Sequence, residues 1–114
     1  MSVNPHHALE FVPVLVLVLG AVSALVGLPL IAHRVPRNII YGIRTPLAFS
    51  SDENWYRVNA IGGKFFLRAG LATIPVGLAG LFVPGAYLAV YACAALVLAL
   101  IFNLAAVVAC LRIR

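Results

Sequence analysis

The chain has 114 residues, of which 64% are hydrophobic and only 10% carry a charge. Soluble domains hold about 45–50% apolar and about 25% charged residues, so this composition excludes an ordinary water-soluble fold and indicates a single membrane domain over residues 1–114. The net charge of +5 does not imply direct nucleic-acid binding, because the placement of basic residues around a membrane accounts for most of it.

The first predicted element is a membrane-spanning helix at about residues 10–33. Residues 11–32 carry no charge and would form a helix about 33 Å long, which matches a hydrocarbon core of about 30 Å. This run is longer than the apolar region of a signal peptide, and no basic region precedes it. We therefore expect the first span to remain in the mature protein.

A polar segment follows at residues 34–64, and its first part is predicted to be a structured loop. Pro36 and Pro46 disfavour a helix between them, because proline lacks an amide donor and restricts the residue before it. Residues 34–49 are therefore assigned to this loop.

A short amphipathic helix is predicted next. Ser50 followed by Glu53 is a capping-box pattern, so the helix should begin at Ser50 or Ser51. One predicted face carries Trp55, Asn59, Gly62 and Phe66, and another carries Arg57, Lys64 and Arg68. We expect this helix at the membrane interface, where Trp prefers to lie, with a hinge at Gly62 and Gly63 before the second span.

The rest of the chain is predicted to form two further spans. Residues 69–111 are uncharged and would be roughly 64 Å long as a straight helix, about twice the membrane's thickness. The run must therefore turn back, and Pro84 and Gly85 mark the corner. The predicted fold is an all-α membrane protein with three transmembrane helices, at about residues 10–33, 65–83 and 86–111.

All 8 basic side chains fall on one side of this three-span arrangement. Most lie between the first two apolar runs, and the others are Arg112 and Arg114, whereas residues 1–10 and the corner have none. The positive-inside rule therefore predicts an outside N-terminus, a cytoplasmic segment at residues 34–64 and a cytoplasmic C-terminus.

Small or weakly polar residues form a stripe on each span. The stripes contain Gly20, Ser23, Ala24 and Gly27, then Ala69, Thr73 and Gly77, then Ala95, Ala99 and Asn103. They favour close helix packing, either among the three spans or in a homo-oligomer. Asn103 should hydrogen-bond a neighbouring helix or, alternatively, belong to a ligand site.

Arg44 is the most informative side chain of the loop, since a guanidinium suits bidentate recognition of a carboxylate or phosphate. Its partner could be Asp52 or Glu53, a lipid phosphate, or an anionic group on a partner protein. No catalytic arrangement and no metal-ligand spacing is present, and the adjacent His6 and His7 are a weak metal signal alone. We therefore predict no catalytic residue, no metal, no cofactor and no enzymatic activity.

The polar segment also contains an ordered motif: Asn38, Gly42, Arg44, Thr45, Pro46, Ser51, Trp55, Asn59, Gly62, Gly63 and Lys64. This motif resembles the signature of the SdpI family, bacterial membrane proteins typified by the immunity protein against the sporulation-delaying protein toxin. The founding member protects its host from that toxin and holds a transcriptional repressor at the membrane.

The resemblance implies a short, three-span, non-enzymatic immunity or signalling protein of the bacterial cytoplasmic (inner) membrane. It implies a toxin peptide and a cytoplasmic repressor-type protein as partners. It assigns the shared role to Asn38, Gly42, Arg44, Thr45, Trp55, Asn59 and Gly63.

Two other functions stay open from the residues. A structural or anionic-lipid-binding subunit of a membrane complex would hold head groups with Arg44, Arg57 and Lys64. A small oligomeric transporter is disfavoured, because no Asp, Glu, Lys or Arg lies deep in a span.

Overall fold

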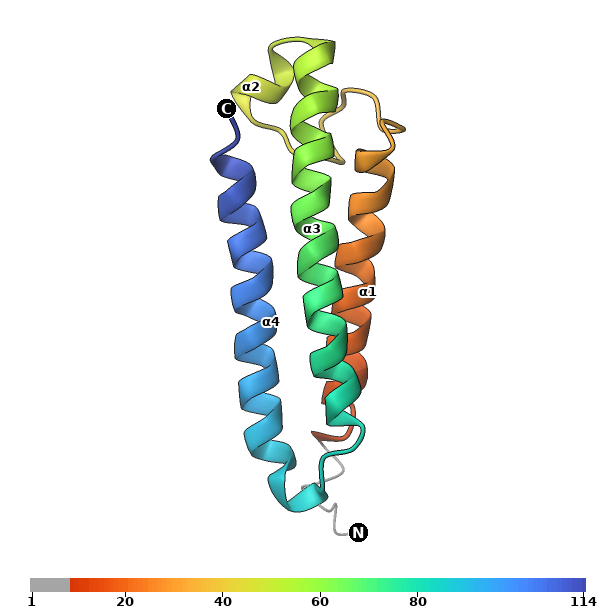
Figure 1. Cartoon of the computed structure of the whole chain (residues 1–114), viewed down its shortest axis with the longest axis vertical. Helices are drawn as coiled ribbons and strands as arrows, with labels where there is room; N and C mark the ends of the chain where they lie inside the picture. Colours follow the sequence, from red (N-terminus) through yellow and green to blue (C-terminus); the bar gives the residue numbers. More distant parts are fainter. Residues whose placement is uncertain (1–8) are drawn as a thin grey trace.

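Three long helices run side by side along the molecule (Figure 1). The structure, a computed structural model, describes residues 9–114, so that the pair His6 and His7 lies outside the described residues. The long helices are α1 (Val12–Ile31), α3 (Asp52–Gly80) and α4 (Leu88–Leu111); the short helix α2 (Pro46–Phe49) precedes α3, and the 3-10 turn η2 (Gly85–Tyr87) precedes α4. Every regular element within residues 9–114 is helical, which confirms the predicted all-α class.

Two helices of the described chain are long and apolar enough to cross a membrane. They cover Val12–Ile31 and Gly85–Leu111, close to the first and third predicted spans. The helix between them, α3, carries Arg57, Lys64 and Arg68 on its exposed side. These charges make α3 less apolar than its two neighbours.

The start of α3 agrees with the prediction, but its capping contact differs. Ser51 is the N-cap, and its hydroxyl accepts a hydrogen bond from the backbone N–H of Asn54 at 3.0 Å. The predicted pairing of Ser50 with Glu53 is therefore wrong by one residue. Ser50 instead donates its hydroxyl to the backbone oxygen of Leu47 at 2.6 Å and so closes α2.

Gly62 and Gly63 lie in the middle of α3 and do not form the predicted hinge. A Cβ at Gly63 would lie 2.7 Å from the backbone oxygen of Gly27 in α1, and one at Gly62 would overlap the side chain of Ile43. The amphipathic helix and the following segment are therefore one continuous helix of 29 residues. The hinge prediction is wrong because both glycines serve close packing instead of bending.

Small residues allow α1 to pack closely against α3. A Cβ at Gly20 would lie 2.9 Å from the side chain of Ile74, and one at Gly70 would overlap the backbone of Gly20 and Ala24. The predicted stripe on α1 therefore contacts α3 within one chain, as expected for membrane helices that associate through backbone proximity. On α3 these contacts are made by Gly70 and Ile74, which lie next to the predicted stripe of Ala69, Thr73 and Gly77. Homo-oligomer formation stays a prediction.

A side-chain hydrogen bond joins α1 to α4 deep in the bundle. The hydroxyl of Ser23 donates to Oδ1 of Asn103 at 2.7 Å, and Nδ2 of Asn103 donates to the backbone oxygen of Ala99 at 2.8 Å. This geometry confirms the prediction that Asn103 bonds a neighbouring helix.

Removal of this interhelical bond should have a small effect on stability. Ser23→Ala and Asn103→Leu are each expected to lower the free energy of unfolding by about 1 kcal/mol or less, measured by SDS titration in mixed micelles. The double variant should lose less unfolding free energy than the sum of the two single losses, because both single changes break the same hydrogen bond. If the losses of unfolding free energy in the two single variants add fully in the double variant, this contact would be contradicted. Cys93→Ala, at an exposed position of α4, serves as the control.

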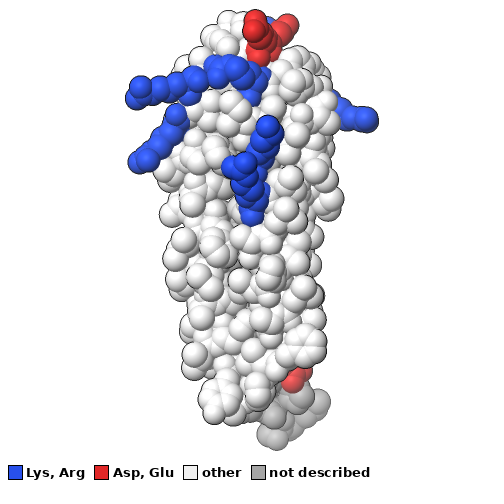
Figure 2. All heavy atoms as spheres, viewed as in Figure 1, with Lys and Arg blue, Asp and Glu red and all other residues white. Residues whose placement is uncertain are grey.

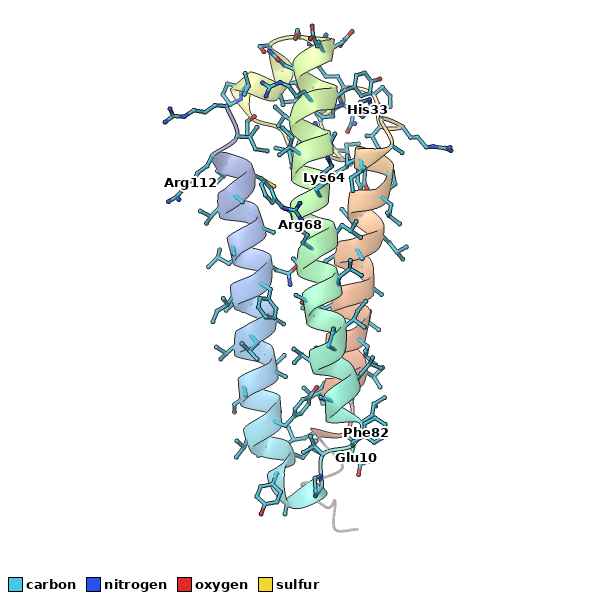
Figure 3. The ribbon with its side chains drawn as sticks, in the orientation of Figure 1. Glu10, His33, Lys64, Arg68, Phe82 and Arg112 are labelled. Atoms are coloured by element: carbon cyan, nitrogen blue, oxygen red, sulfur yellow. The ribbon has the colours of Figure 1, made fainter. Side chains whose placement is uncertain are left out.

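Charged residues gather at the end of the bundle that holds α2. Figure 2 shows the Lys and Arg side chains of the visible face in the upper half of the molecule. In Figure 3, His33, Lys64, Arg68 and Arg112 lie towards this end, whereas Glu10 and Phe82 lie at the opposite end. The predicted corner at Pro84 and Gly85 is confirmed and belongs to that opposite end.

Candidate functional site

Asn38 shapes the first half of the loop between α1 and α2. Its Oδ1 accepts hydrogen bonds from the backbone N–H groups of Ile40 at 2.8 Å and Tyr41 at 2.6 Å. Its Nδ2 donates to the backbone oxygens of Pro36 at 2.7 Å and Tyr41 at 3.0 Å. An asparagine side chain that hydrogen-bonds neighbouring backbone groups in this way stabilises a turn that has no regular secondary structure. The amide of Asn38 therefore fixes the conformation of this part of the loop.

Asn59 holds the second half of the loop against α3. The residue is only 1% exposed, and its Oδ1 accepts a hydrogen bond from the backbone N–H of Ile43 at 2.6 Å. Its Nδ2 donates to the backbone oxygens of Ile43 at 3.3 Å and Trp55 at 2.9 Å. The amide therefore satisfies both backbone polar groups of Ile43, which would otherwise be buried without partners.

Trp55 forms the centre of the core beneath the loop. Its side chain is fully buried, its Nε1 donates to the backbone oxygen of Val35 at 2.8 Å, and its ring centroid lies 5.4 Å from that of Phe49. The same core contains Ile43, Ala48, Val58 and Cys110. The ring of Trp55 is therefore not exposed to lipid, because it is enclosed by protein and its N–H is used inside the loop. The position of this part of α3 at the membrane interface stays a prediction.

Gly42 lets the loop pass directly over these two side chains. Its φ is +116°, a value that residues with a Cβ rarely adopt. A Cβ there would lie 2.7 Å from Oδ1 of Asn59 and 3.2 Å from the ring of Trp55. Gly42, Trp55 and Asn59 thus form one contact cluster, here called the loop clamp, whereas Gly63 lies outside it at the crossing of α1 and α3.

Thr45 ends the loop by starting α2. Its Oγ1 accepts a hydrogen bond from the backbone N–H of Ala48 at 3.2 Å, and Pro46 follows as the first helical residue. Both features are typical of helix N-termini. Thr45 is therefore a capping residue, and Pro46 opens a helical turn within the segment for which the sequence predicted a loop.

Arg44 is exposed at the edge of the loop and forms a hydrogen bond to the loop backbone. Its guanidinium donates to the backbone oxygen of Ile39, and the ion pair of Asp52 is made by Arg37, with Nη2 at 3.2 Å from Oδ1. Of the alternatives open for Arg44, the pairing with Asp52 is therefore not made, and an outside phosphate or partner anion stays a prediction. A guanidinium has five donors, so the bond to Ile39 leaves most of them open to an outside anion.

A groove of about 670 Å³ lies beneath the loop, between α1 and α4. Val26 and Leu30 line it from α1, Val107 and Leu111 line it from α4, and Arg44 is among the loop residues at its edge. Its size falls in the range of small-ligand sites, and its walls are mostly apolar.

Tyr41, Ile39 and Ile40 complete this edge of the groove. The hydroxyl of Tyr41 donates to the backbone oxygen of Val26 at 2.5 Å, and burial raises the pKa of Tyr41 above its ordinary value. Ile39 is 77% and Ile40 85% exposed. Two large apolar side chains are therefore displayed beside a cation on a loop held in shape by Asn38.

The exposed groups at this edge of the groove are one cation and two apolar side chains, those of Arg44, Ile39 and Ile40. No buried side-chain nitrogen or oxygen among the described residues lacks a hydrogen-bond partner. In residues 9–114 no three His, Cys, Asp or Glu side chains come together to hold a metal ion. The buried amide of Asn59 and the indole of Trp55 are used to fix the loop backbone, whereas Arg44 and the two isoleucines are exposed.

Sequence reasoning grouped Trp55 and Asn59 on one helix face but missed what they hold. Their four-residue spacing gave the face correctly. Their partners are backbone groups, which every residue has and which leave no signal in a sequence. The sequence feature that could have indicated the groove is the apolar pair Ile39 and Ile40 within an otherwise polar segment.

Comparison with known proteins gives a family match. A family model described as the SdpI/YfhL protein family matches residues 34–111, more than half of the chain. The matched range contains the loop, α2, α3, α4 and every predicted site residue. Searches of curated proteins and of solved structures returned no match.

Proposed function

The chain belongs to the SdpI/YfhL protein family, and on that premise we propose that it is a non-enzymatic immunity or signalling protein of the bacterial cytoplasmic membrane. In this proposal the chain meets a membrane-active toxin peptide and engages a repressor-type protein on the cytoplasmic side. Family membership and the long apolar helices support this assignment.

The proposal includes three membrane spans with the loop in the cytoplasm. The middle helix, α3, lies between α1 and α4 and runs alongside both (Figure 1), which supports a common passage through the membrane. Lys and Arg side chains occupy the loop, α3 as far as Arg68, and the chain after α4, whereas the corner at Pro84 has none. By the positive-inside rule, the N-terminus and the corner lie outside, and the loop and the C-terminus lie in the cytoplasm.

The observation that carries the recognition role is the loop clamp. Asn59 and Trp55 fix the loop backbone by four hydrogen bonds, three to the loop and one within α3, so the loop meets a partner in one conformation. A fixed loop loses little conformational entropy on binding. Arg44, Ile39 and Ile40 would then offer a cation and an apolar pair at the edge of the groove.

A protection assay tests this function. A bacterium sensitive to the sporulation-delaying protein toxin should survive better when it expresses the intact chain than when it carries an empty vector. Arg44→Gln should lower protection about tenfold at equal protein level, because hydrogen bonds to charged groups contribute about 1.5–3 kcal/mol. Arg34→Gln removes an exposed arginine at the end of α1 and is the matched control, expected to protect like the intact chain.

Two results would count against the proposal. Equal killing with and without the intact chain would remove the immunity role and favour a structural or lipid-binding subunit. Equal protection by Arg44→Gln and Arg34→Gln would remove Arg44 from the recognition surface.

A further inference from the structure

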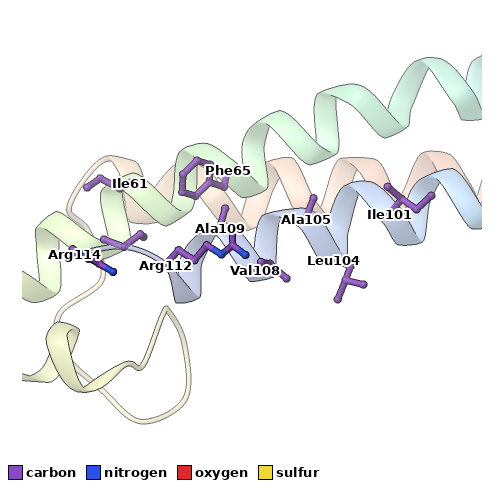
Figure 4. A pocket seen from close by; sticks show the side chains of 10 residues that line it. Ile61, Phe65, Ile101, Leu104, Ala105, Val108, Ala109, Arg112 and Arg114 are labelled. Carbon is purple, nitrogen blue, oxygen red and sulfur yellow. The ribbon is translucent and has the colours of Figure 1, made fainter.

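A second groove, of about 760 Å³, lies between α3 and α4. Figure 4 shows Ile61 and Phe65 on its α3 wall, with Ile101, Ala105 and Ala109 on its α4 wall. A smaller hollow of about 340 Å³ adjoins it, since both are lined by Phe65, Ala105 and Ala109. The two hollows are therefore treated as one feature, here called the α3–α4 groove.

Small side chains keep this groove open. Ala105 and Ala109 lie one helical turn apart on α4, and Ala69 and Ala72 line the smaller hollow from α3. A methyl group on each wall leaves the space that a larger side chain would fill. Because α4 is one of the two helices able to cross a membrane, this space opens towards lipid chains when α4 is inserted.

Cations line the groove towards the α2 end of the bundle. Arg112 and Arg114 belong to the larger hollow and Arg68 to the smaller one. In Figure 3, Arg68 of α3 and Arg112, just after α4, both lie in the half of the bundle that holds α2. Nη1 of Arg57 donates to the backbone oxygen of Arg114 at 2.9 Å, which brings a further cation to this end.

Acidic side chains are placed elsewhere. Neither hollow is lined by an Asp or Glu. Asp52 pairs with Arg37 at the start of α3, and Glu10 lies at the opposite end of the bundle (Figure 3). The groove thus combines apolar walls with a basic end that no Asp or Glu lines.

We propose that the α3–α4 groove binds an anionic membrane phospholipid, with an acyl chain along the alanines and the phosphate at Arg68 and Arg112. Arginine suits phosphate because its planar donors can bond two oxygens at once, and long basic side chains near helix ends reach the head groups. A single molecule with an apolar tail and an anionic head matches both parts of the groove.

A second copy of the chain fits this groove less well. Most homodimers are two-fold symmetric, so a contact centred on the groove would bring each arginine of one copy close to those of the other. Like charges close together are destabilising. An anionic lipid neutralises the same charges. The proposal requires that α4 cross the membrane, and it does not depend on Arg44, on the groove beneath the loop or on the immunity role.

Photolabelling of the full chain in vesicles tests the lipid site. The vesicles contain phosphatidylcholine with a trace of phosphatidylglycerol that carries a photoreactive acyl chain, and the labelled peptides are identified by mass spectrometry. Label is expected on residues 101–109 of α4. Ala105→Leu should abolish it by filling the groove, whereas Ala94→Leu, an equal change at an exposed position of α4 that lines neither hollow, should leave it unchanged.

Charge variants complete the test. Arg68→Gln and Arg112→Gln should each reduce labelling by phosphatidylglycerol about fivefold, the effect of about one basic side chain near an anionic surface, whereas Arg34→Gln should not change it. Equal labelling by a phosphatidylcholine probe with the same photoreactive chain would overturn the proposal. So would labelling unaffected by Ala105→Leu, or a dimer that Ala105→Leu dissociates, because a second copy would then occupy the groove.

Discussion

Trp55→Ala is expected to lower the free energy of unfolding by about 3–5 kcal/mol, the usual cost of removing a large buried aromatic side chain. The ring is fully buried in the core beneath the loop, and its Nε1 bond to Val35 ties the start of the loop to α3. Without the indole ring, both its packing in the core and the hydrogen bond to Val35 are lost. SDS titration in mixed micelles measures the change, and proteolysis of the loop should accelerate in parallel.

Trp55→Phe separates the two contributions. Phenylalanine keeps most of the apolar ring but cannot donate to the backbone oxygen of Val35. We expect a smaller loss, of about 1–3 kcal/mol, because a partly buried acceptor is left unpaired. A loss for Trp55→Ala no larger than that for Trp55→Phe would contradict the packing role assigned to the ring.

Asn59→Ala is expected to have the second large effect. It leaves the buried N–H and C=O groups of Ile43 without partners, each at a cost of about 1–3 kcal/mol. The loop should detach from α3, which would be visible as faster amide hydrogen exchange at Ile43. The free energy of unfolding is again measured by SDS titration.

Asn54→Ala is the matched control for Asn59→Ala. Asn54 is also an asparagine of α3, but its amide bonds Ser50 and Arg57 in the exposed part of the helix. Its loss should change stability by about 0.5 kcal/mol or less. Equal effects of the two substitutions would mean that Asn59 does not hold the loop.

The positions of the long helices could be predicted because the membrane sets their length. The uncharged run at residues 11–32 gave α1 to within a residue at each end, and Pro84 with Gly85 gave the corner before α4. The continuity of α3 could not be predicted from Gly62 and Gly63. A glycine pair fits either a bend or a close crossing, and the choice depends on Gly27 and Ile43, which lie far away in the sequence.

The candidate site was predicted as a set of residues but not as a set of contacts. The capping hydroxyl near the start of α3 and the shared face of Trp55 and Asn59 follow from local spacing. The acceptor of Arg44 and the partners of Asn59 are backbone groups, and the choice of Arg37 over Arg44 for Asp52 depends on how the loop turns. Local sequence carries no information on these long-range placements.

The three-span arrangement with a cytoplasmic loop is tested most directly by cysteine accessibility in intact cells. Cys93 and Cys110 are first replaced by alanine, and a single cysteine is then introduced by Gly85→Cys, where a side chain meets no other atom within 4 Å, or by Arg34→Cys at the exposed end of α1. Gly85→Cys should react with a membrane-impermeant thiol reagent in intact cells, and Arg34→Cys only after the membrane is permeabilised. Protection of Gly85→Cys until permeabilisation would place the corner in the cytoplasm and contradict the passage of α3 through the membrane.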